Sequence, residues 1–359
     1  CTCPNRAALF SYMGRIPQLD ILRAIAVLMV IGFHYHYDWL LDRTGWAGVD
    51  LFFVLSGFLI SGVLFIDEKR TGTISLKRFY YRRSLKIYPA YFFFLLLTAI
   101  CFPQVRSVLG LQDIFFLQSY FKPAWIHTWS LAVEEHFYFL LPPLLLLLIS
   151  RRKLGLIPFI SLALLALCLT LRILAWAVRP TLEHVAYPSH LRMDSLFAGV
   201  ALGYLFHYRG EIFHRFRGPK TLALGLCALL PIVALPRETG FNLTCGLTFA
   251  TVGFAALLAW SVNHPALRFR PVEQIGQYSY SIYLWHYVVV SYFRAFPKTP
   301  AHYLLYCAIT AGVGIAMAEI IEIPCLRLRD HFAPNRRRFT VPGLAVAESP
   351  AAEPHPRHV

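Results

Sequence analysis

Two ionisable side chains, Arg23 and His34, lie within one long apolar stretch, residues 19–39. Ionisable groups are costly in the apolar interior of a membrane, so their presence there indicates a function. The two positions are eleven residues apart, which is almost three turns at 3.6 residues per turn and corresponds to roughly 16 Å along the helix axis. We therefore expect one helix face to carry a fixed cation and a titratable imidazole.

The imidazole of His34 suits the removal of a proton from a hydroxyl group, because the pKa of histidine lies near neutral pH. The alternative is a structural role, in which His34 bonds across a helix bundle and Arg23 extends to the lipid headgroups.

A second motif, HTWSLAVEEHFYFLLP at 127–142, places Glu134 in an apolar segment, where an unpaired carboxylate costs several kcal/mol. We expect Glu134 to orient the histidine or to bind a substrate hydroxyl. Trp129 and Ser130 open this motif and are expected substrate contacts, although Ser130 also suits a helix cap.

A third motif, RFYYRRSLKIYPAY at 78–91, contains a dense group of basic side chains. Arg82, Arg83 and Lys86 suit the phosphates of a nucleotide-like donor, and Tyr88 follows them in the same expected donor site. Maintenance of topology or contact with anionic lipid explains the basic residues equally well.

Two further motifs supply candidate substrate contacts. SHLRMDSLFAGVALGY places His190, Arg192 and Asp194 at the expected outer end of a helix, and GQYSYSIYLWHY at 276–287 supplies Tyr280 and His286. An interfacial aromatic belt is the alternative explanation for the tyrosines. A histidine inside an apolar helix, such as His286, is harder to explain that way.

The elements that must position these residues are membrane helices. Of the 359 residues, 57% are hydrophobic and only 15% are charged, which is typical of a polytopic membrane protein. The net charge of +15 comes from short basic clusters between apolar blocks, which argues against a nucleic-acid-binding patch. We predict an all-α fold with about ten transmembrane helices, at residues 19–39, 47–66, 86–103, 131–150, 155–177, 192–208, 220–236, 242–261, 277–295 and 302–323.

The basic residues of the connecting segments are distributed unequally between the two sides of the membrane. Alternate connections together with the C-terminal tail contain 21 Lys and Arg residues, and the opposite connections contain seven. The positive-inside rule then places both termini in the cytoplasm and His34 in the outer half of the bilayer. The expected location is the cell inner (plasma) membrane, as a multi-pass protein.

The predicted membrane domain covers residues 16–326. Residues 1–15 form an expected N-terminal tail, which we interpret as a miscalled start with Met13 as the true one, and 327–359 form an expected tail that is basic and then disordered. The eight cysteines have no spacing typical of a disulfide framework or a zinc site. We predict no bound metal and no cleavable signal peptide, because Asp20 and Arg23 interrupt the first apolar segment.

Together these motifs resemble the membrane-bound acyltransferase-3 family. The similarity extends from about residue 16 to 325 and is most specific in LDILRAIAVLMVIGFHY, GVDLFFVLSGFLI, RRSLKIYPAY, HTWSLAVEEHFYFLLP, SHLRMDSLFAG and YSYSIYLWH. The resemblance implies that His34 is the catalytic histidine, that Arg23 is its essential partner, and that Arg82, Arg83 and Lys86 belong to a motif associated with acyl-CoA. Lys86 stands where arginine is common, which leaves the donor geometry less defined.

The activity implied by the resemblance is O-acylation, with transfer of a group other than an amino-acyl group. The co-substrate would be acyl-CoA, most often acetyl-CoA, and the acceptor a hydroxyl of a cell-envelope or exported carbohydrate. The expected partners are these two molecules and membrane lipids, with no nucleic acid. The sequence leaves open whether a separate extracytoplasmic transferase completes the reaction. The alternative function is a proton-coupled transporter or flippase of a glycan or lipid-linked solute, which also suits buried His, Arg and Glu.

Overall fold

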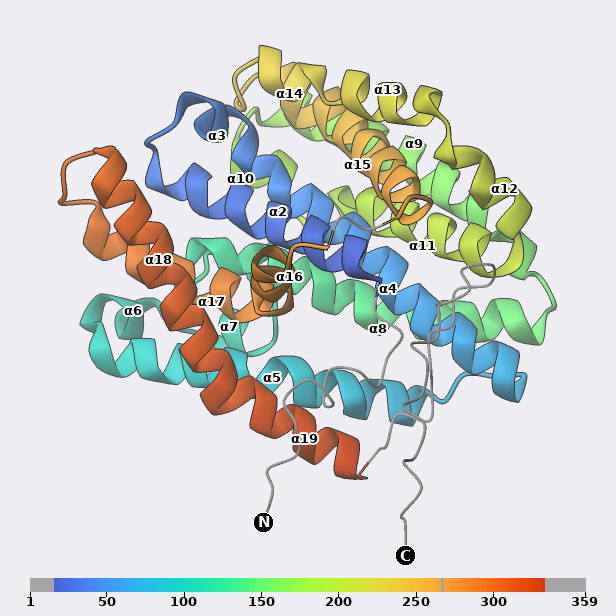
Figure 1. Ribbon diagram of the computed structural model, residues 1–359, viewed down its shortest axis with the longest axis horizontal. Helices are drawn as coiled ribbons and strands as arrows, with labels where there is room; N and C mark the ends of the chain where they lie inside the picture. The colour runs from blue at the N-terminus through green and yellow to red at the C-terminus, as the bar shows by residue number, and fades with distance from the viewer. Residues whose placement is uncertain (1–15, 266–267, 333–359) are drawn as a thin grey trace, which may run out of the picture. The chain divides into compact units, whose positions relative to one another are not determined.

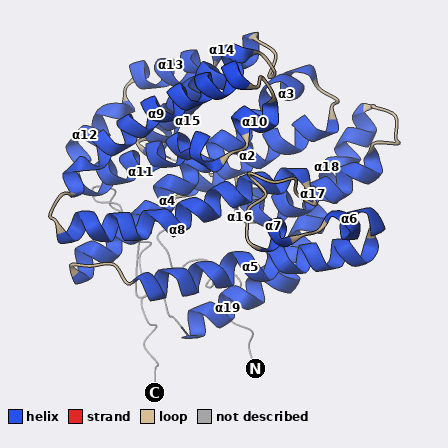
Figure 2. Ribbon diagram, turned by 180° about the vertical axis from the view of Figure 1, so that it is seen from behind, coloured by secondary structure: helices blue, strands red, loops and turns tan. Residues whose placement is uncertain are grey.

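A computed structural model of the chain describes residues 16–265 and 268–332. Within these ranges every regular element is a helix and no strand occurs (Figure 2). The predicted all-α class is confirmed for this part of the chain. The predictions made for residues 1–15 and 333–359 concern positions outside the described residues.

Nine long helices form the body of the described region (Figure 1). Their bounds are α2 (Pro17–Tyr35), α4 (Gly48–Thr71), α5 (Leu76–Cys101), α8 (Trp129–Ser150), α9 (Ile157–Val178), α11 (Met193–Tyr208), α15 (Leu247–Val262), α17 (Ser279–Phe293) and α18 (Pro300–Met317). Shorter helices connect or extend them: α3 (Trp39–Thr44), α6 (Pro103–Val108), α7 (Leu111–Ile114), α10 (Leu182–Ala186), α12 (Gly210–His214), α13 (Pro219–Ala228), α14 (Leu230–Ala234), α16 (Arg270–Gln277) and α19 (Ile323–Phe332). Two π-helical turns, Asn242–Gly246 and Ala318–Glu322, precede α15 and α19.

Seven helical segments are long and apolar enough to cross a membrane, or eight if the bent pair Gly210–Arg217 and Pro219–Ala234 forms one span. Each of the ten predicted apolar segments falls largely on helix. However, α11 and α17 have only 16 and 15 residues, fewer than the roughly 20 that a straight spanning helix needs. The chain is thus a multi-pass helical protein by composition and length, and the count of ten stays a prediction.

Three helix ends differ from the predicted ones. Helix α5 begins at Leu76, where Ser75 accepts a hydrogen bond from the Arg78 backbone, so the basic motif lies on the helix and not in a loop before it. Helix α2 ends at Tyr35 because His36 takes a left-handed conformation, with φ of 56°. At the other end of the chain, α19 continues to Phe332, where a tail was expected from residue 327.

Helices α4 and α11 cross each other closely. A Cβ added to Gly57 would overlap the carbonyl group of Leu196, and one added to Gly199 would overlap that of Val54. Small residues at such a crossing let two backbones approach, as in many membrane helix pairs. Gly57 and Gly199 therefore allow the close contact between these two helices.

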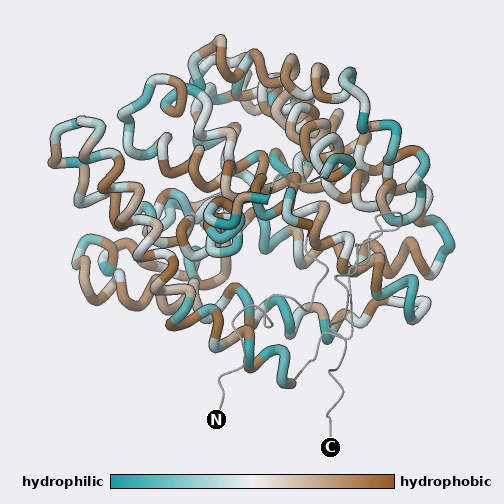
Figure 3. Tube along the Cα trace, in the orientation of Figure 1, coloured by the Kyte–Doolittle hydropathy of each residue, from teal (hydrophilic) through white to brown (hydrophobic). Residues whose placement is uncertain are grey.

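Helix α2 lies at the centre of the described helices, where it contacts α4, α16 and α17. Helix α5 contacts α19 in the lower part of the view in Figure 1. Hydrophilic residues are concentrated along α19 and the nearby end of α5 (Figure 3). The first turns of α2 face this polar region, because Lys86 of α5 interacts electrostatically with Arg23 of α2 and with Arg329 of α19.

Candidate active site

His34 occupies the last turn of α2, with its side chain half-buried. Its Nδ1 atom is 2.9 Å from the carbonyl oxygen of Val30, one turn earlier. A carbonyl oxygen can only accept, so the neutral imidazole carries its proton on Nδ1 and leaves the lone pair of Nε2 free to take another. Because the unpaired carbonyls at a helix C-terminus favour a cation, an imidazolium formed here is stabilised.

His34 belongs to a group of three histidines that come from different elements. The Nε2 atom of His286, on α17, is 3.2 Å from Nδ1 of His34, and His286 donates from its own Nδ1 to the carbonyl oxygen of Tyr283. The ring of His127, which lies in the short turn before α8, has its centre 5.0 Å from that of His286. His286 is fully buried and His127 is 2% exposed. Only His34 therefore has an accessible imidazole in this group, which we call the histidine cluster.

Two tyrosines of α17 hold the histidine cluster together. Tyr287 stacks on the ring of His127 at 5.1 Å and meets the ring of His34 edge-on, also at 5.1 Å. Tyr283 donates to the carbonyl oxygen of His127 at 2.8 Å and lies 2.6 Å from Oγ of Ser130. Ser130 thus supports the turn that presents His127 and does not cap α8. Its role as a substrate contact stays a prediction.

The described part of the chain contains no group of three or more His, Cys, Asp or Glu side chains arranged to hold a metal ion. His127 uses Nε2 toward the carbonyl oxygen of Leu284, and His286 uses Nδ1 toward that of Tyr283. Each ring therefore keeps a lone pair on its other nitrogen, and His286 uses that lone pair to accept from Nδ1 of His34.

A basic cluster, formed by Arg23, Arg82, Arg83 and Lys86, occupies the other end of α2 and the first half of α5. Lys86 interacts electrostatically with Arg23, with Arg83, and with Glu322 and Arg329 from the end of the chain. Arg82 forms an ion pair with Asp330 at 3.0 Å. The structure thus brings together Arg23 and the predicted donor-binding residues, about 16 Å along α2 from His34 by helical rise.

Glu134 lies beside Arg83 of the basic cluster and does not contact the histidine cluster. It accepts hydrogen bonds from Ser56 at 2.8 Å and from Tyr138, and Arg83 lies 3.8 Å from its Oε2 atom. The expectation that Glu134 fixes the tautomer of His34 is therefore wrong in this structure, because the Val30 carbonyl and His286 occupy the Nδ1 position. Glu134 instead positions Arg83, whose guanidinium also packs 3.7 Å from the ring centre of Tyr138.

Tyr88 and Tyr280 connect α5 to its neighbours. Tyr88 donates to Glu135 on α8 at 3.2 Å, and Tyr280 donates to the backbone carbonyl of Ile87 at 3.0 Å. Tyr88 lies one turn from the basic cluster, as its assignment to the donor site requires. Tyr280 lies on the same side and not beside His34, so the structure does not bring it together with the other expected acceptor contacts.

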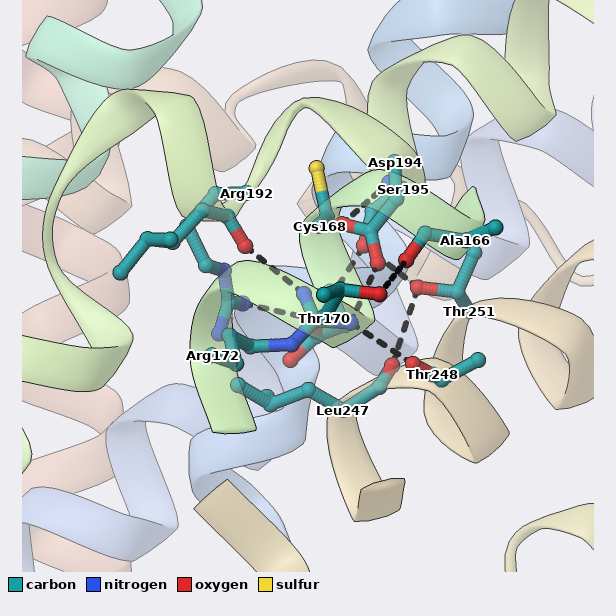
Figure 4. Close-up of polar contacts among 12 residues, drawn as sticks. Ala166, Cys168, Thr170, Arg172, Arg192, Asp194, Ser195, Leu247, Thr248 and Thr251 are labelled. Carbon is teal, nitrogen blue, oxygen red and sulfur yellow. Dashed lines mark hydrogen bonds and ion pairs between the residues drawn. The ribbon is translucent and has the colours of Figure 1, made fainter. Parts of the chain in front are cut away.

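Arg192 and Asp194 take part in a buried ion-pair network (Figure 4). Arg192 pairs with Asp50 of α4 at 2.7 Å, and Asp194 pairs with Arg172 of α9 at 2.7 Å. The side chains of Arg172 and Asp194 are both 0% exposed, and Arg172 also donates to Thr248 of α15 at 2.7 Å. The network therefore joins α4, α9, α11 and α15, and the side chain of Asp194 is enclosed within it, where a substrate does not reach it in this structure.

Trp129 and Arg192 face a small cavity, whereas His190 lies on the surface. The cavity measures about 20 Å³, and its wall also includes Trp46 and Arg237. Trp129 stacks on Tyr187 at 4.8 Å between ring centres. His190 is exposed and stacks on Tyr120 at 5.7 Å, so it is separate from both the histidine cluster and the cavity wall.

Sequence reasoning missed several residues that the structure brings to His34. His127 opens the motif at 127–142, and Tyr283 and Tyr287 flank His286, so each was adjacent to a recognised signal. Arg237 lies in a connection without any motif. Its guanidinium carbon is 5.0 Å from the ring centre of Phe33, the neighbour of His34, and only tertiary packing reveals that contact.

Comparison with known proteins identifies the family. The model of the acyltransferase domain family matches residues 16–319. The chain is 28% identical over 315 residues to the peptidoglycan O-acetyltransferase OatA of Listeria monocytogenes, covering 77% of this chain and 49% of that protein. It is also 28% identical over 361 residues to the O-acetyltransferase OatA of Staphylococcus aureus (strain NCTC 8325 / PS 47), covering 86% and 57%, and 29% identical over 329 residues to a putative O-acetyltransferase of Staphylococcus aureus (strain COL), covering 80% and 52%.

The chain spans about half the length of these curated relatives. No solved structure matches it. The family match nevertheless covers both the basic cluster and the histidine cluster, and its bounds agree with the first described helix and the π-helical turn after α18. The chain belongs to the acyltransferase domain family.

Proposed function

We propose that this chain is a membrane O-acetyltransferase that moves an acetyl group from acetyl-CoA to a hydroxyl of a cell-envelope or exported carbohydrate. The observation that carries the proposal is the arrangement of α2, which has the basic cluster at its first turns and the histidine cluster at its last. An acyl-CoA molecule has a polyanionic end and a reactive thioester joined by an extended pantetheine arm. Such a molecule matches two sites separated along one helix.

In the proposed complex, the basic cluster binds the phosphates of the donor. Arg83 is the best placed member, because Glu134 and Tyr138 fix its orientation and a guanidinium can bind phosphate oxygens in a bidentate manner. Arg23 and Lys86 supply further positive charge from α2 and α5. The excess of Lys and Arg in the connections on this side supports a cytoplasmic donor entrance, in the cell inner membrane.

At the histidine cluster, the Nε2 lone pair of His34 takes the proton of the acceptor hydroxyl. The hydroxyl oxygen then attacks the thioester carbonyl carbon, the carbon–sulfur bond breaks, and the imidazolium returns its proton to the departing CoA sulfur. Val30 and His286 hold the Nδ1 proton throughout. Attack by His34 itself, through an acyl-imidazole, requires the same lone pair. The relatives' printed function, acetylation of peptidoglycan for one of them, supports a carbohydrate acceptor.

The test is transfer of label from radioactive acetyl-CoA to a glycan fraction by the purified chain in vesicles. We expect His34→Ala to lose at least a hundredfold in rate, because general-base catalysis contributes about 10²–10⁴. His36→Gln is the matched control, since His36 is exposed and its Nδ1 faces Asp42 at 3.2 Å. Near-normal transfer by His34→Ala would refute the assignment. Uphill movement of an unmodified solute without acetyl-CoA would instead support a transporter.

A further inference from the structure

Arg237 forms no ion pair with a carboxylate on the described part of the chain. The ion pairs of the described residues involve other arginines, and the Nε atom of Arg237 is buried without a hydrogen-bond partner. Tyr187 interacts with it, and Glu238 acts on it from the next position. Burial lowers the pKa of Arg237, an effect that these two neighbours oppose, but a guanidinium stays protonated at neutral pH. A half-buried charge without an ion-pair partner favours an anionic ligand.

The cavity beside Arg237 has the composition of a carbohydrate site. Its wall contains Trp46 and Trp129 as well as Arg192, but the charge of Arg192 is already neutralised by Asp50 at 2.7 Å. The volume of about 20 Å³ is enough for a water molecule or one small polar group. A carboxylate would therefore enter next to Arg237, while the ring that bears it would stay at the mouth, against the stacked pair of Trp129 and Tyr187.

The cavity lies next to the proposed catalytic histidine. Arg237 packs on the ring of Phe33 at 5.0 Å and acts electrostatically on His34 itself. Trp129 is adjacent in sequence to Ser130, which bonds to Tyr283 below the histidine cluster. A ligand held by Arg237 would thus lie near His34, because Arg237 contacts the residue that precedes it.

Two more cations surround the last turn of α2. Arg294 donates to the hydroxyl of Tyr287 at 3.1 Å, and Lys298 donates to the Tyr35 carbonyl at 2.7 Å and lies 3.9 Å from the centre of that ring. Asp38, which caps α3, and Asp42, which faces His36, lie in the same region. Of the three cations, Arg237 is the one that acts electrostatically on His34.

We propose that Arg237 binds a carboxylate of the acceptor, so that the acceptor is an acidic glycan whose hydroxyl is presented to His34. This inference rests on the proposed function and specifies its substrate class. A carboxylate at Arg237 also removes one positive charge from the environment of His34, which favours the imidazolium formed during proton transfer.

The experiment uses the full chain in phosphatidylcholine vesicles, which contain no anionic lipid to compete. The acceptors are peptide-free peptidoglycan glycan strands, whose lactyl carboxylates are free, and the same strands after conversion of those carboxylates to methylamides. We expect the wild-type chain to have at least a tenfold lower KM for the carboxylate form. Arg237→Gln should abolish that preference, Arg237→Lys should restore part of it, and neither should change the KM for acetyl-CoA. Arg106→Gln, which removes an exposed cation of α6, should behave like the wild-type chain.

Three results would overturn the inference: equal KM values for the two strands, retention of the preference by Arg237→Gln, or loss of transfer by this variant to both strands alike. Release of CoA, measured without acceptor, distinguishes a failure of the acidic-acceptor inference from a failure of the proposed function. If CoA release depends on His34 but neither strand is labelled, the acidic acceptor is wrong and the donor chemistry stands. If CoA release does not depend on His34, the proposed function fails first.

Discussion

His286 offers the sharpest test of how the histidine cluster works. Its Nε2 atom accepts from Nδ1 of His34 at 3.2 Å, while the Val30 carbonyl accepts from the same proton at 2.9 Å. The shorter of the two bonds is the one to the backbone carbonyl. Helix α2 itself is therefore the main determinant of which nitrogen of His34 carries the proton. We therefore predict that His286 positions His34 and does not transfer protons with the substrate.

Two substitutions by amide side chains separate these roles. In His286→Asn the amide nitrogen replaces Nδ1 and keeps the bond to Tyr283, but the acceptor toward His34 is lost. In His286→Gln the amide oxygen replaces Nε2 and keeps that acceptor. A neutral hydrogen bond contributes about 0.5–1.5 kcal/mol, so His286→Asn should lower kcat roughly three- to tenfold, and His286→Gln should stay closer to the wild-type value.

The assay is acetyl transfer at saturating acetyl-CoA across a range of pH, with thermal unfolding in detergent as the folding control. Loss of the acceptor leaves Nδ1 of His34 with the Val30 bond alone, so the acid limb of the pH–rate profile should shift for His286→Asn and not for His286→Gln. A loss of a hundredfold or more in folded His286→Asn, equal to that of His34→Ala, would refute the reasoning and make His286 part of the proton path.

Two other predictions concern the opposite end of α2 and the buried network. Arg83→Gln should raise the KM for acetyl-CoA about tenfold, since a charge-assisted bond to phosphate contributes about 1.5–3 kcal/mol. The control is Arg151→Gln, which removes an exposed cation at the end of α8. An unchanged KM for Arg83→Gln would exclude the basic cluster as the donor site. Arg172→Met should lower the free energy of unfolding by about 3–5 kcal/mol, because it leaves Asp194 buried and unpaired. The double variant Arg172→Met with Asp194→Leu should recover most of that loss, measured by thermal unfolding. An Arg172→Met variant as stable as the wild-type chain would contradict this account.

Much of the fold could be predicted from the sequence because the formation of a membrane helix depends mainly on the residues of that helix. A run of apolar residues must form a helix in lipid to satisfy its backbone, so the segments at 155–177 and 242–261 were close to the observed helices. Helix ends were less predictable, as α5 shows: its first turns are basic, and apolarity alone could not reveal that a cap at Ser75 extends the helix before the membrane.

The candidate site could be predicted where it depends on one helix. Arg23 and His34 share α2, and helical periodicity alone places one near each end of the bundle. Glu134 does not orient His34, although its expected contact with a substrate hydroxyl stays a prediction, and Asp194 is enclosed by its neighbours, because a carboxylate selects its partner in three dimensions. Glu134 lies with Arg83, and Asp194 pairs with Arg172, 22 positions away in the chain.

The sequence by itself determined that this protein is helical, that it is apolar enough for a membrane, that it belongs to its family, and that a cation and an imidazole share α2. Only the tertiary structure decided what meets that imidazole: His286, 252 positions away in the chain, and Arg237 against the neighbouring Phe33. The physical reason is that a helix sets the spacing of its own side chains by local geometry. Which faces of two helices meet depends on the packing of the whole bundle, including close crossings such as that of Gly57 and Gly199.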